Sequence, residues 1–349
     1  MPTFCRHNRF IERCPICSKT MPEDSPLRPR ASRTARPSAK RPSARAARAA
    51  GAGARRTPRG EALRVRREIR AEDDGYRSPL VPGLHASADA QRLAEEIAFS
   101  HGRLIGLAAA PLGLYAEARD LAPSDLERAT WTCFLISYLS PLDGAPDTLE
   151  EGDMLDGDAF AGIRMALARV GPDGLPDLAG VPLGPRTSHD PARGTETLLA
   201  YRHWVERSGG SAAEAFRGDA SWTPERRFER VFERLALPGF ARMGRYDLLV
   251  TLGRLGLYEL RGGSLALSGG RGLAGEDLTT LAAKRIFAIG DPLLLERRAH
   301  ALAGAIDVPI EALDLALANW ASTERATLGF PAGIGDEGAL ARSSDALGL

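Results

Sequence analysis

Apolar residues recur at helical spacing through most of the chain. Within residues 88–110, Leu93, Ile97, Leu104 and Leu107 fall on one face, which predicts an amphipathic helix. The same spacing predicts helices over residues 124–139, 158–170, 195–208, 223–235, 245–255, 276–288, 292–305 and 309–321. Residues 257–267, with two glycines in the middle, instead have the pattern of a β-hairpin. The chain is therefore predicted to be all-α apart from this short segment.

Two of these helices carry clear start signals. Ser124 is the predicted N-cap of the helix over residues 124–139, and Glu127 three residues later completes the pattern of a capping box. Pro224 stands at the first position of the helix over residues 223–235, where its missing N–H removes no hydrogen bond. Both helices are therefore expected to begin at these residues.

The charges are unevenly divided along the chain. The 349 residues include 46 basic and 45 acidic ones, but residues 28–70 hold 15 Arg or Lys against two acids. Because residues 21–75 are rich in Pro, Ser, Ala, Gly and Arg, this stretch is predicted to be a disordered linker. Its arginines would neutralise nucleic-acid phosphates, and the partner expected for it is DNA. Alternatively, it is a solubilising tail; an anionic membrane surface is less favoured, because no apolar face accompanies the charges.

Three of the four cysteines lie within the first 17 residues. Cys5, His7, Cys14 and Cys17 form a C-x-H-x6-C-x2-C pattern. Four such ligands at this spacing can surround one tetrahedral ion, so residues 1–20 are predicted to be a knuckle with a structural zinc. The alternative is a group of free, solvent-facing cysteines.

Several other classes of protein are not expected. The chain has no run of 18 apolar residues and no apolar stretch at its N-terminus, so we predict a cytoplasmic protein with no membrane partner. The remaining histidines are scattered, and no phosphate-binding loop of the G-x4-G-K-[ST] type occurs. The helical body is expected to span residues 76–335 and to be followed by a flexible tail over residues 336–349.

Two predicted helix pairs are joined by a tight glycine turn, at residues 235–240 and 286–292. Such a turn exposes backbone N–H groups at the start of the second helix, where a phosphate can bind. Residues 221–300 hold 13 basic residues against 9 acidic ones, which favours this interpretation. The alternative is that the turns simply join packed helices.

The first of these turns carries a family resemblance. The run Leu237-Pro-Gly-Phe240, followed by Gly244-Arg245 and an apolar helix, resembles the hairpin of helix-hairpin-helix DNA glycosylases, and residues 129–141 resemble the early apolar helix of that fold. The whole body, from about residue 88 to residue 330, is similar to the α-glutamyl/putrescinyl thymine pyrophosphorylase family, clade 3. The resemblance implies an all-helical transferase that replaces pyrophosphate on 5-hydroxymethyluracil in DNA by an amino group of an amino acid or polyamine.

The chain departs from the glycosylase pattern in two respects. Between residues 246 and 256 the hairpin segment offers only Asp247 as an acid, and the first hairpin has no lysine for a Schiff base. Base excision is therefore the less favoured of the enzymatic alternatives. A further alternative is a non-catalytic, zinc-containing module that binds nucleic acid and recognises modified bases.

Displacing pyrophosphate from a base methylene requires cations for the leaving oxyanions and an acid that takes a proton from the incoming ammonium. For the cations we predict Arg242, Arg245 and Lys284. For the proton, Asp291 is the first choice and Asp247 the second. Asp291 precedes a proline, however, and is equally suited to capping a helix.

The target base must also leave the duplex and enter a pocket. Trp131, Tyr138 or Tyr246 are the predicted stacking partners of the flipped base. Trp131 and Tyr138 are seven residues apart, so they also fit a stripe of core residues on one helix.

Overall fold

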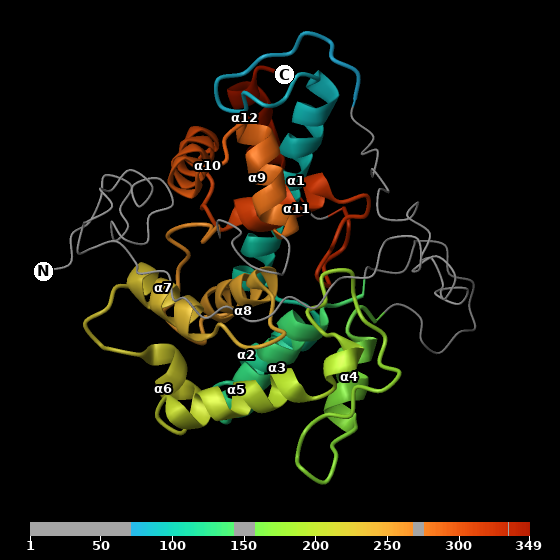
Figure 1. Ribbon diagram of the computed structural model, residues 1–349, viewed down its shortest axis with the longest axis vertical. Coiled ribbons are helices and arrows are strands. Elements are labelled where there is room, and N and C mark those ends of the chain that lie inside the picture. The colour runs from blue at the N-terminus through green and yellow to red at the C-terminus, as the bar shows by residue number, and fades with distance from the viewer. Residues whose placement is uncertain (1–70, 143–157, 268–275, 334) are drawn as a thin grey trace, which may run out of the picture. The chain divides into compact units, whose positions relative to one another are not determined.

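A computed structural model describes residues 71–142, 158–267, 276–333 and 335–349. The regular secondary structure of these ranges is helical, and no β-strand occurs in them, so the all-α prediction is confirmed for this part of the chain. The helices are α1 (Ser87–Ala109), α2 (Gly113–Leu121), α3 (Leu126–Leu139), α4 (Ala161–Ala168), η3 (Pro191–Arg193, a 3-10 turn), α5 (Glu196–Arg207), α6 (Ala212–Arg217), α7 (Pro224–Arg234), α8 (Arg242–Arg254), α9 (Leu278–Phe287), α10 (Pro292–Ile306), α11 (Ala312–Ala321) and α12 (Glu337–Leu347) (Figure 1).

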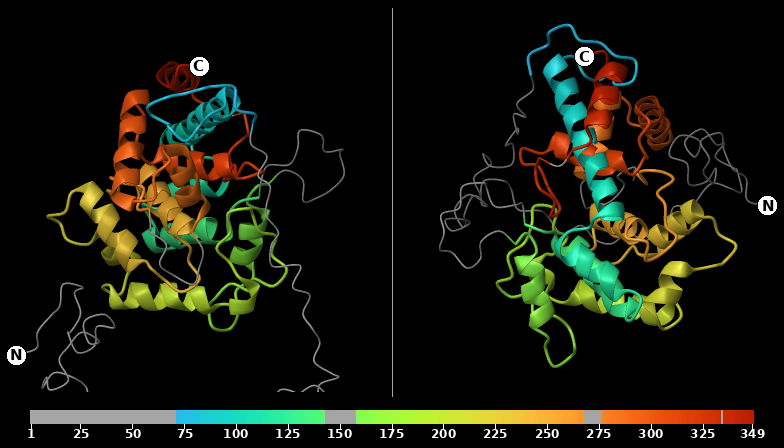
Figure 2. Two further views of the ribbon diagram at one scale, coloured as in Figure 1. Left: turned by 45° about the horizontal axis from the view of Figure 1, so that its top comes forward. Right: turned by 180° about the vertical axis from the view of Figure 1, so that it is seen from behind.

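The helices form two groups that meet at α8. The first helix, α1, packs against α11 and α12, and α9 packs against α11 and α10. In the second group, α3 contacts α2, α4, α6 and α8, while α7 contacts α8. Figure 2 shows the C-terminal helices gathered around α1 and the middle helices below them. Contacts between α1 and α8 connect the two groups.

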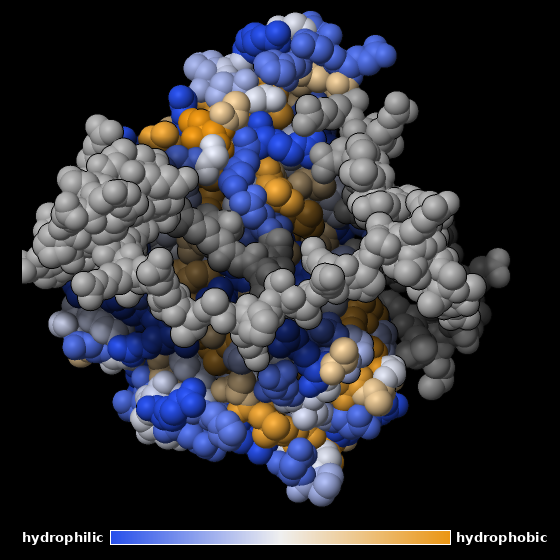
Figure 3. Space-filling model, viewed as in Figure 1, coloured by the Kyte–Doolittle hydropathy of each residue, from blue (hydrophilic) through white to orange (hydrophobic). Residues whose placement is uncertain are grey.

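The long first helix behaves as a core helix. By length and composition alone, the stretch Ser87–Leu121 is apolar enough to cross a membrane, a test that core helices also pass. The predicted stripe Leu93, Ile97, Leu104 and Leu107 is at most 1% exposed. Where the described residues are visible in Figure 3, hydrophobic and hydrophilic residues are interspersed.

The predicted start of α7 is confirmed, whereas α3 begins one residue later than predicted. Thr223 caps α7, with Pro224 in its first position. The cap of α3 is Asp125, whose side chain accepts from Arg128 N at 3.0 Å. Ser124 does not cap the helix, because its hydroxyl donates to Leu121 O. Glu127 does not complete a capping box either, because its carboxylate accepts hydrogen bonds from the first two backbone N–H groups of α6.

The β-hairpin prediction for residues 257–267 is wrong. The backbone N–H groups of Leu265 and Leu267 donate to the carboxylate of Glu296, each at 2.9 Å. The hydroxyl of Tyr246 donates to Ser264 O at 2.8 Å. Side chains of α8 and α10 therefore occupy backbone groups that a cross-strand ladder would need.

The C-terminal residues, expected to form a flexible tail over 336–349, instead form α12. Asp336 caps this helix and accepts from Gly338 N at 3.0 Å. Its other carboxylate oxygen lies 2.7 Å from Nδ1 of His101 in α1. Since Ala339 and Leu347 are buried, α12 belongs to the packed core.

Candidate active site

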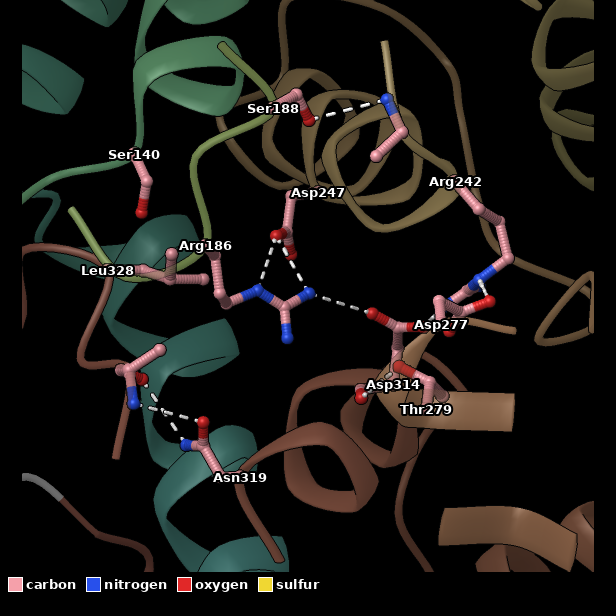
Figure 4. Close-up of polar contacts among 12 residues, drawn as sticks. Ser140, Arg186, Ser188, Arg242, Asp247, Asp277, Thr279, Asp314, Asn319 and Leu328 are labelled. Atoms are coloured by element: carbon pink, nitrogen blue, oxygen red, sulfur yellow. Dashed lines mark hydrogen bonds and ion pairs between the residues drawn. The ribbon is translucent and has the colours of Figure 1, made fainter. Parts of the chain in front are cut away.

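A chain of alternating charges crosses the interior where α8, α9 and α11 meet (Figure 4). Arg186 donates to Asp247 Oδ2 from Nε at 3.2 Å and from Nη2 at 3.0 Å. The same Nη2 lies 3.2 Å from Asp314 Oδ2. The second oxygen of Asp314 accepts from Arg242, whose Nε donates to Asp277 Oδ2 at 3.1 Å. Three carboxylates and two guanidinium groups therefore hold one another in a fixed order.

These groups are removed from solvent. Arg186, Arg242 and Asp247 are each 7% exposed, and Asp314 is 1% exposed. Burial alone would lower the pKa of Arg186, but Asp247 and Asp314 outweigh it, so this pKa is raised. Burial raises the pKa of Asp314, against the opposing effect of Arg242 and Arg186. Because an unpaired charge is costly in such surroundings, each member depends on its neighbours.

A tightly docked loop places Arg186 in this chain. Ser188 N donates to Tyr138 O at 2.8 Å, which fastens the loop to the C-terminal turn of α3. A Cβ on Gly184 would lie 1.8 Å from Pro141 O, so only glycine permits this close approach. Arg186 is two residues further along, so its backbone is held in a fixed position relative to the end of α3.

A small cavity adjoins the end of the charge chain that Arg186 and Asp247 form. Its volume is about 10 Å³, close to the ~10–15 Å³ that a single water requires. Its wall includes Arg103 of α1, Tyr115 of α2, Ser137 of α3, Ser140, Arg186, Asp247 and Leu328. Ser140 and Leu328 both have positive φ, at 61° and 52°, a strained conformation for residues other than glycine. Two strained backbone positions thus meet at one cavity beside a buried ion pair.

Two arginines of this wall have unused donors. Nε and Nη2 of Arg103 and Nη1 of Arg186 are buried and have no hydrogen-bond partner among the described residues. Buried donors are normally paired, so groups of this kind require an explanation.

The structure brings two of the predicted site residues, Arg242 and Asp247, into the same charge chain. All three guanidinium nitrogens of Arg242 bond within the protein: Nε to Asp277, Nη1 to Leu265 O at 2.7 Å, and Nη2 to Asp314. Each guanidinium nitrogen of Arg242 therefore has an acceptor within the protein, so this side chain stabilises the packing of the interior. Asp247, in contrast, lines the cavity and uses only Oδ2 in its contacts with Arg186.

The other two predicted cations make contacts elsewhere. The guanidinium of Arg245 lies 4.5 Å above the ring of Phe232, and its Nη1 donates to Phe232 O at 3.1 Å. Burial and then the charge of Arg242 lower the pKa of Arg245. Lys284 pairs with Glu276. Neither side chain lines the cavity beside Asp247.

Asp291 is the N-cap of α10. Its exposed carboxylate accepts from Leu293 N and Leu294 N, both at 3.0 Å. This arrangement fits the capping alternative for Asp291.

The three predicted stacking residues differ in exposure. Tyr138 and Tyr246 are fully buried, and their hydroxyls bond to His189 Nδ1 and Ser264 O. Trp131 is half-buried and, together with Tyr201, lines a separate surface pocket of about 350 Å³. Among these three residues, Trp131 is thus the one in a pocket large enough for a ligand.

The sequence interpretation missed Arg103, Arg186 and Asp314. Asp314 is the one charged residue in the apolar run 312–321, and Arg103 stands in the similarly apolar run 102–110. A lone charge in such a run indicates a buried partner or ligand, so a signal existed for both. Arg186 lies in an irregular, polar stretch, which offers no comparable signal.

Part of the prediction lies outside the described residues. This applies to the zinc ligands Cys5, His7, Cys14 and Cys17 and to almost all of the linker over 21–75. Within the ranges that the structure describes, no group of three or more His, Cys, Asp or Glu is arranged to hold a metal ion.

Comparison with known proteins gives one family. Residues 186–329 match the family model of alpha-glutamyl/putrescinyl thymine pyrophosphorylase clade 3, which confirms the family resemblance for this part of the predicted body. The match covers less than half of the chain. It begins at Arg186 and includes every member of the charge chain, namely Arg186, Arg242, Asp247, Asp277 and Asp314. No curated protein and no solved structure matches. The relation to helix-hairpin-helix glycosylases stays a prediction.

Proposed function

We propose that this chain, whose residues 186–329 match the thymine pyrophosphorylase family model, replaces pyrophosphate on 5-hydroxymethyluracil in DNA by the amino group of an amino acid or polyamine. The observation that carries the proposal is the family match over residues 186–329. The buried Asp247–Arg186 pair beside a cavity lies within that match and supports a reaction centre at this place.

The chemistry sets two requirements. The bond between the base methylene and the pyrophosphate oxygen breaks, and its electron pair leaves with pyrophosphate, so cations must stabilise the oxyanion. A bond from the methylene to the amine nitrogen forms, and the incoming ammonium gives up one proton to a base. A site for this reaction therefore combines guanidinium groups with a carboxylate.

Asp247 is the better supported of the two predicted proton acceptors. It lines the cavity, and no bond from a described residue occupies its Oδ1. Arg186 fixes the orientation of the carboxylate through two bonds to Oδ2. Asp291 is instead occupied in capping α10. Trp131 lines a pocket separate from the cavity of Asp247, so its role as the stacking partner of the flipped base stays a prediction.

The N-terminal segments are proposed to supply DNA affinity. The ligand spacing in residues 1–20 supports a structural zinc, and the basic excess of residues 28–70 supports contacts with phosphates. The expected zinc content is about one ion per chain. Metal analysis of the purified chain and of its Cys14→Ser variant tests this, and equal zinc content in both would contradict the knuckle.

The decisive experiment measures pyrophosphate release from an oligonucleotide that carries 5-hydroxymethyluracil pyrophosphate. Release is followed with and without amino acids and polyamines, and the nucleosides are then analysed by mass. Amine-dependent release with the matching mass gain is the expected result. Absence of release above the uncatalysed rate, while the oligonucleotide is bound, would contradict the proposal and favour the non-catalytic module.

A pair of variants locates the chemistry. Asp247→Asn keeps the shape of the side chain but removes the base, and it is expected to lower the rate by roughly 10²- to 10⁴-fold. Asp120→Asn is the matched control, since the Asp120 side chain is 75% exposed. DNA affinity should be the same in both variants. A rate unchanged by Asp247→Asn would remove Asp247 from the mechanism.

A further inference from the structure

We propose that Arg103 and Arg186 form an oxyanion site that takes one terminal phosphoryl oxygen of pyrophosphate into the cavity between α1, α3 and α8. That the ligand is an oxyanion follows from the buried contacts. Its identity as pyrophosphate rests on the proposed function.

Arg103 is a buried cation that forms no direct ion pair with a described residue. It is 2% exposed, and no carboxylate pairs with it in the part of the chain that the structure describes. Its guanidinium carbon lies 6.0 Å from the centre of the Phe330 ring. The neighbouring phenol of Tyr115 is no counter-ion either, because burial raises the pKa of Tyr115 to about 12, although Arg103 opposes this shift. A guanidinium in such surroundings is expected to have an anionic partner that binds from outside.

Arg186 presents a third unpartnered nitrogen at the same cavity. Its Nε and Nη2 are held by Asp247 and Asp314, so the plane of the guanidinium is fixed before any ligand arrives. Nη1 has no partner among the described residues. Donors whose orientation is fixed in advance need no rearrangement when negative charge develops, which is the property of an oxyanion hole.

The size and the wall of the cavity determine what can enter. At about 10 Å³ it is close to the size of one water, so a phosphate group can enter it at most in part. The charged residues in the wall are two arginines and one aspartate. Two residues with hydroxyl groups, Ser137 and Ser140, also line the cavity. Guanidinium groups match phosphate oxygens in both charge and hydrogen-bond geometry. The wall therefore suits the end of a phosphate chain better than a neutral ligand.

A single ordered water is the structural alternative. Water accepts through two lone pairs, whereas three buried nitrogens on these arginines need an acceptor. One water therefore leaves a donor unsatisfied, which favours an anionic oxygen as the occupant.

The test uses the full chain and inorganic pyrophosphate without DNA. Binding is measured by calorimetry at constant ionic strength, with sodium chloride replacing pyrophosphate in the reference titration. Arg103→Met is expected to raise the dissociation constant at least tenfold. Arg103→Lys keeps the charge but loses the planar fork, so its affinity should lie between those of Arg103→Met and the unchanged chain.

Arg227→Met is the matched control. Arg227 is as buried as Arg103, at 6% exposure, but it donates to the carbonyl oxygens of Arg217, Trp222 and Glu259. Arg227→Met should lower the urea midpoint and leave the pyrophosphate affinity unchanged. Arg103→Met should weaken pyrophosphate binding and change the urea midpoint less than Arg227→Met does, because Nε and Nη2 of Arg103 have no hydrogen bond to lose.

Two results would overturn the inference. One is an equal loss of stability in Arg103→Met and Arg227→Met with unchanged pyrophosphate affinity, which would make Arg103 structural and the cavity a water site. The other is modified-DNA turnover by a chain whose pyrophosphate affinity does not respond to Arg103→Met. Pyrophosphate binding that depends on Arg103, without release from modified DNA, would instead leave the anion site intact and refute only the proposed function.

Discussion

Replacing Arg186 by methionine provides a quantitative test of the charge chain. The substitution removes both hydrogen bonds to Asp247, which has no other side-chain partner among the described residues. Asp314 keeps its bond to Arg242. Asp247, at 7% exposure, would be left as an uncompensated buried carboxylate. Breaking a buried pair in this way costs about 3–5 kcal/mol, and we expect a loss in that range.

A second substitution separates the cost of the unpaired charge from the loss of packing. In the double variant Arg186→Met/Asp247→Asn no charge is left unpaired at this position, so the double variant should be more stable than the sum of the single losses implies. The coupling free energy is expected near the upper end of the ~0.5–3 kcal/mol range for contacting residues. A total stability of about 5–15 kcal/mol leaves room to measure each variant.

The assay is equilibrium urea unfolding at pH 7, followed through the four tryptophans, all of which lie in the described helices and turns. The slope of the free energy against urea should be the same in all variants, because a changed slope indicates an altered denatured state. Strictly additive losses would refute the reasoning, since they would mean that Arg186 and Asp247 do not depend on each other. A loss below about 1 kcal/mol in Arg186→Met would also refute it, because that is the range of exposed ion pairs.

Three further predictions concern the surroundings of the site and the basic arm. Burial lowers the pKa of His189, so the unfolded chain takes up a proton first as the pH falls below about 6.5; stability should therefore decrease on acidification from that pH, and His189→Gln should reduce the decrease in urea midpoints measured from pH 8 to pH 5. Gly184→Ala should destabilise by about 1–3 kcal/mol and slow pyrophosphate release, because the new Cβ would meet Pro141 O and shift Arg186; an unchanged urea midpoint would contradict this. Deleting residues 1–70 should flatten the salt dependence of DNA binding measured by titration, and an unchanged slope would exclude the basic arm from the interface.

Helix periodicity predicted most of the fold because the large helices bury continuous apolar stripes. The start of α10 at Pro292 and the stripe of α1 were both predictable from local sequence. The short helices α2 and α6, nine and six residues long, have too few turns for a pattern to be recognised. Residues 257–267 were misassigned because Glu296, about thirty residues away in sequence, takes their backbone donors.

The candidate site was predictable only where a residue stands out from its surroundings. Asp247 was noticed as the one acid of the hairpin segment, but its partner Arg186 lies 61 residues earlier in an irregular loop. No periodicity links the two, since tertiary packing alone brings them together. Asp291 was the first choice as proton acceptor, although an acid before a proline also suits a helix cap, and the structure has the capping arrangement.

The far end of the charge chain restricts how the helices can move. Asp277, which binds Arg242 of α8, is also the N-cap of α9 and accepts from Thr280 N. A displacement of α9 by about 1.5 Å along the line of this contact would stretch the 3.1 Å distance between Arg242 and Asp277 beyond hydrogen-bond range. A motion that separates the start of α9 from α8 therefore has to break the ion pair between Arg242 and Asp277.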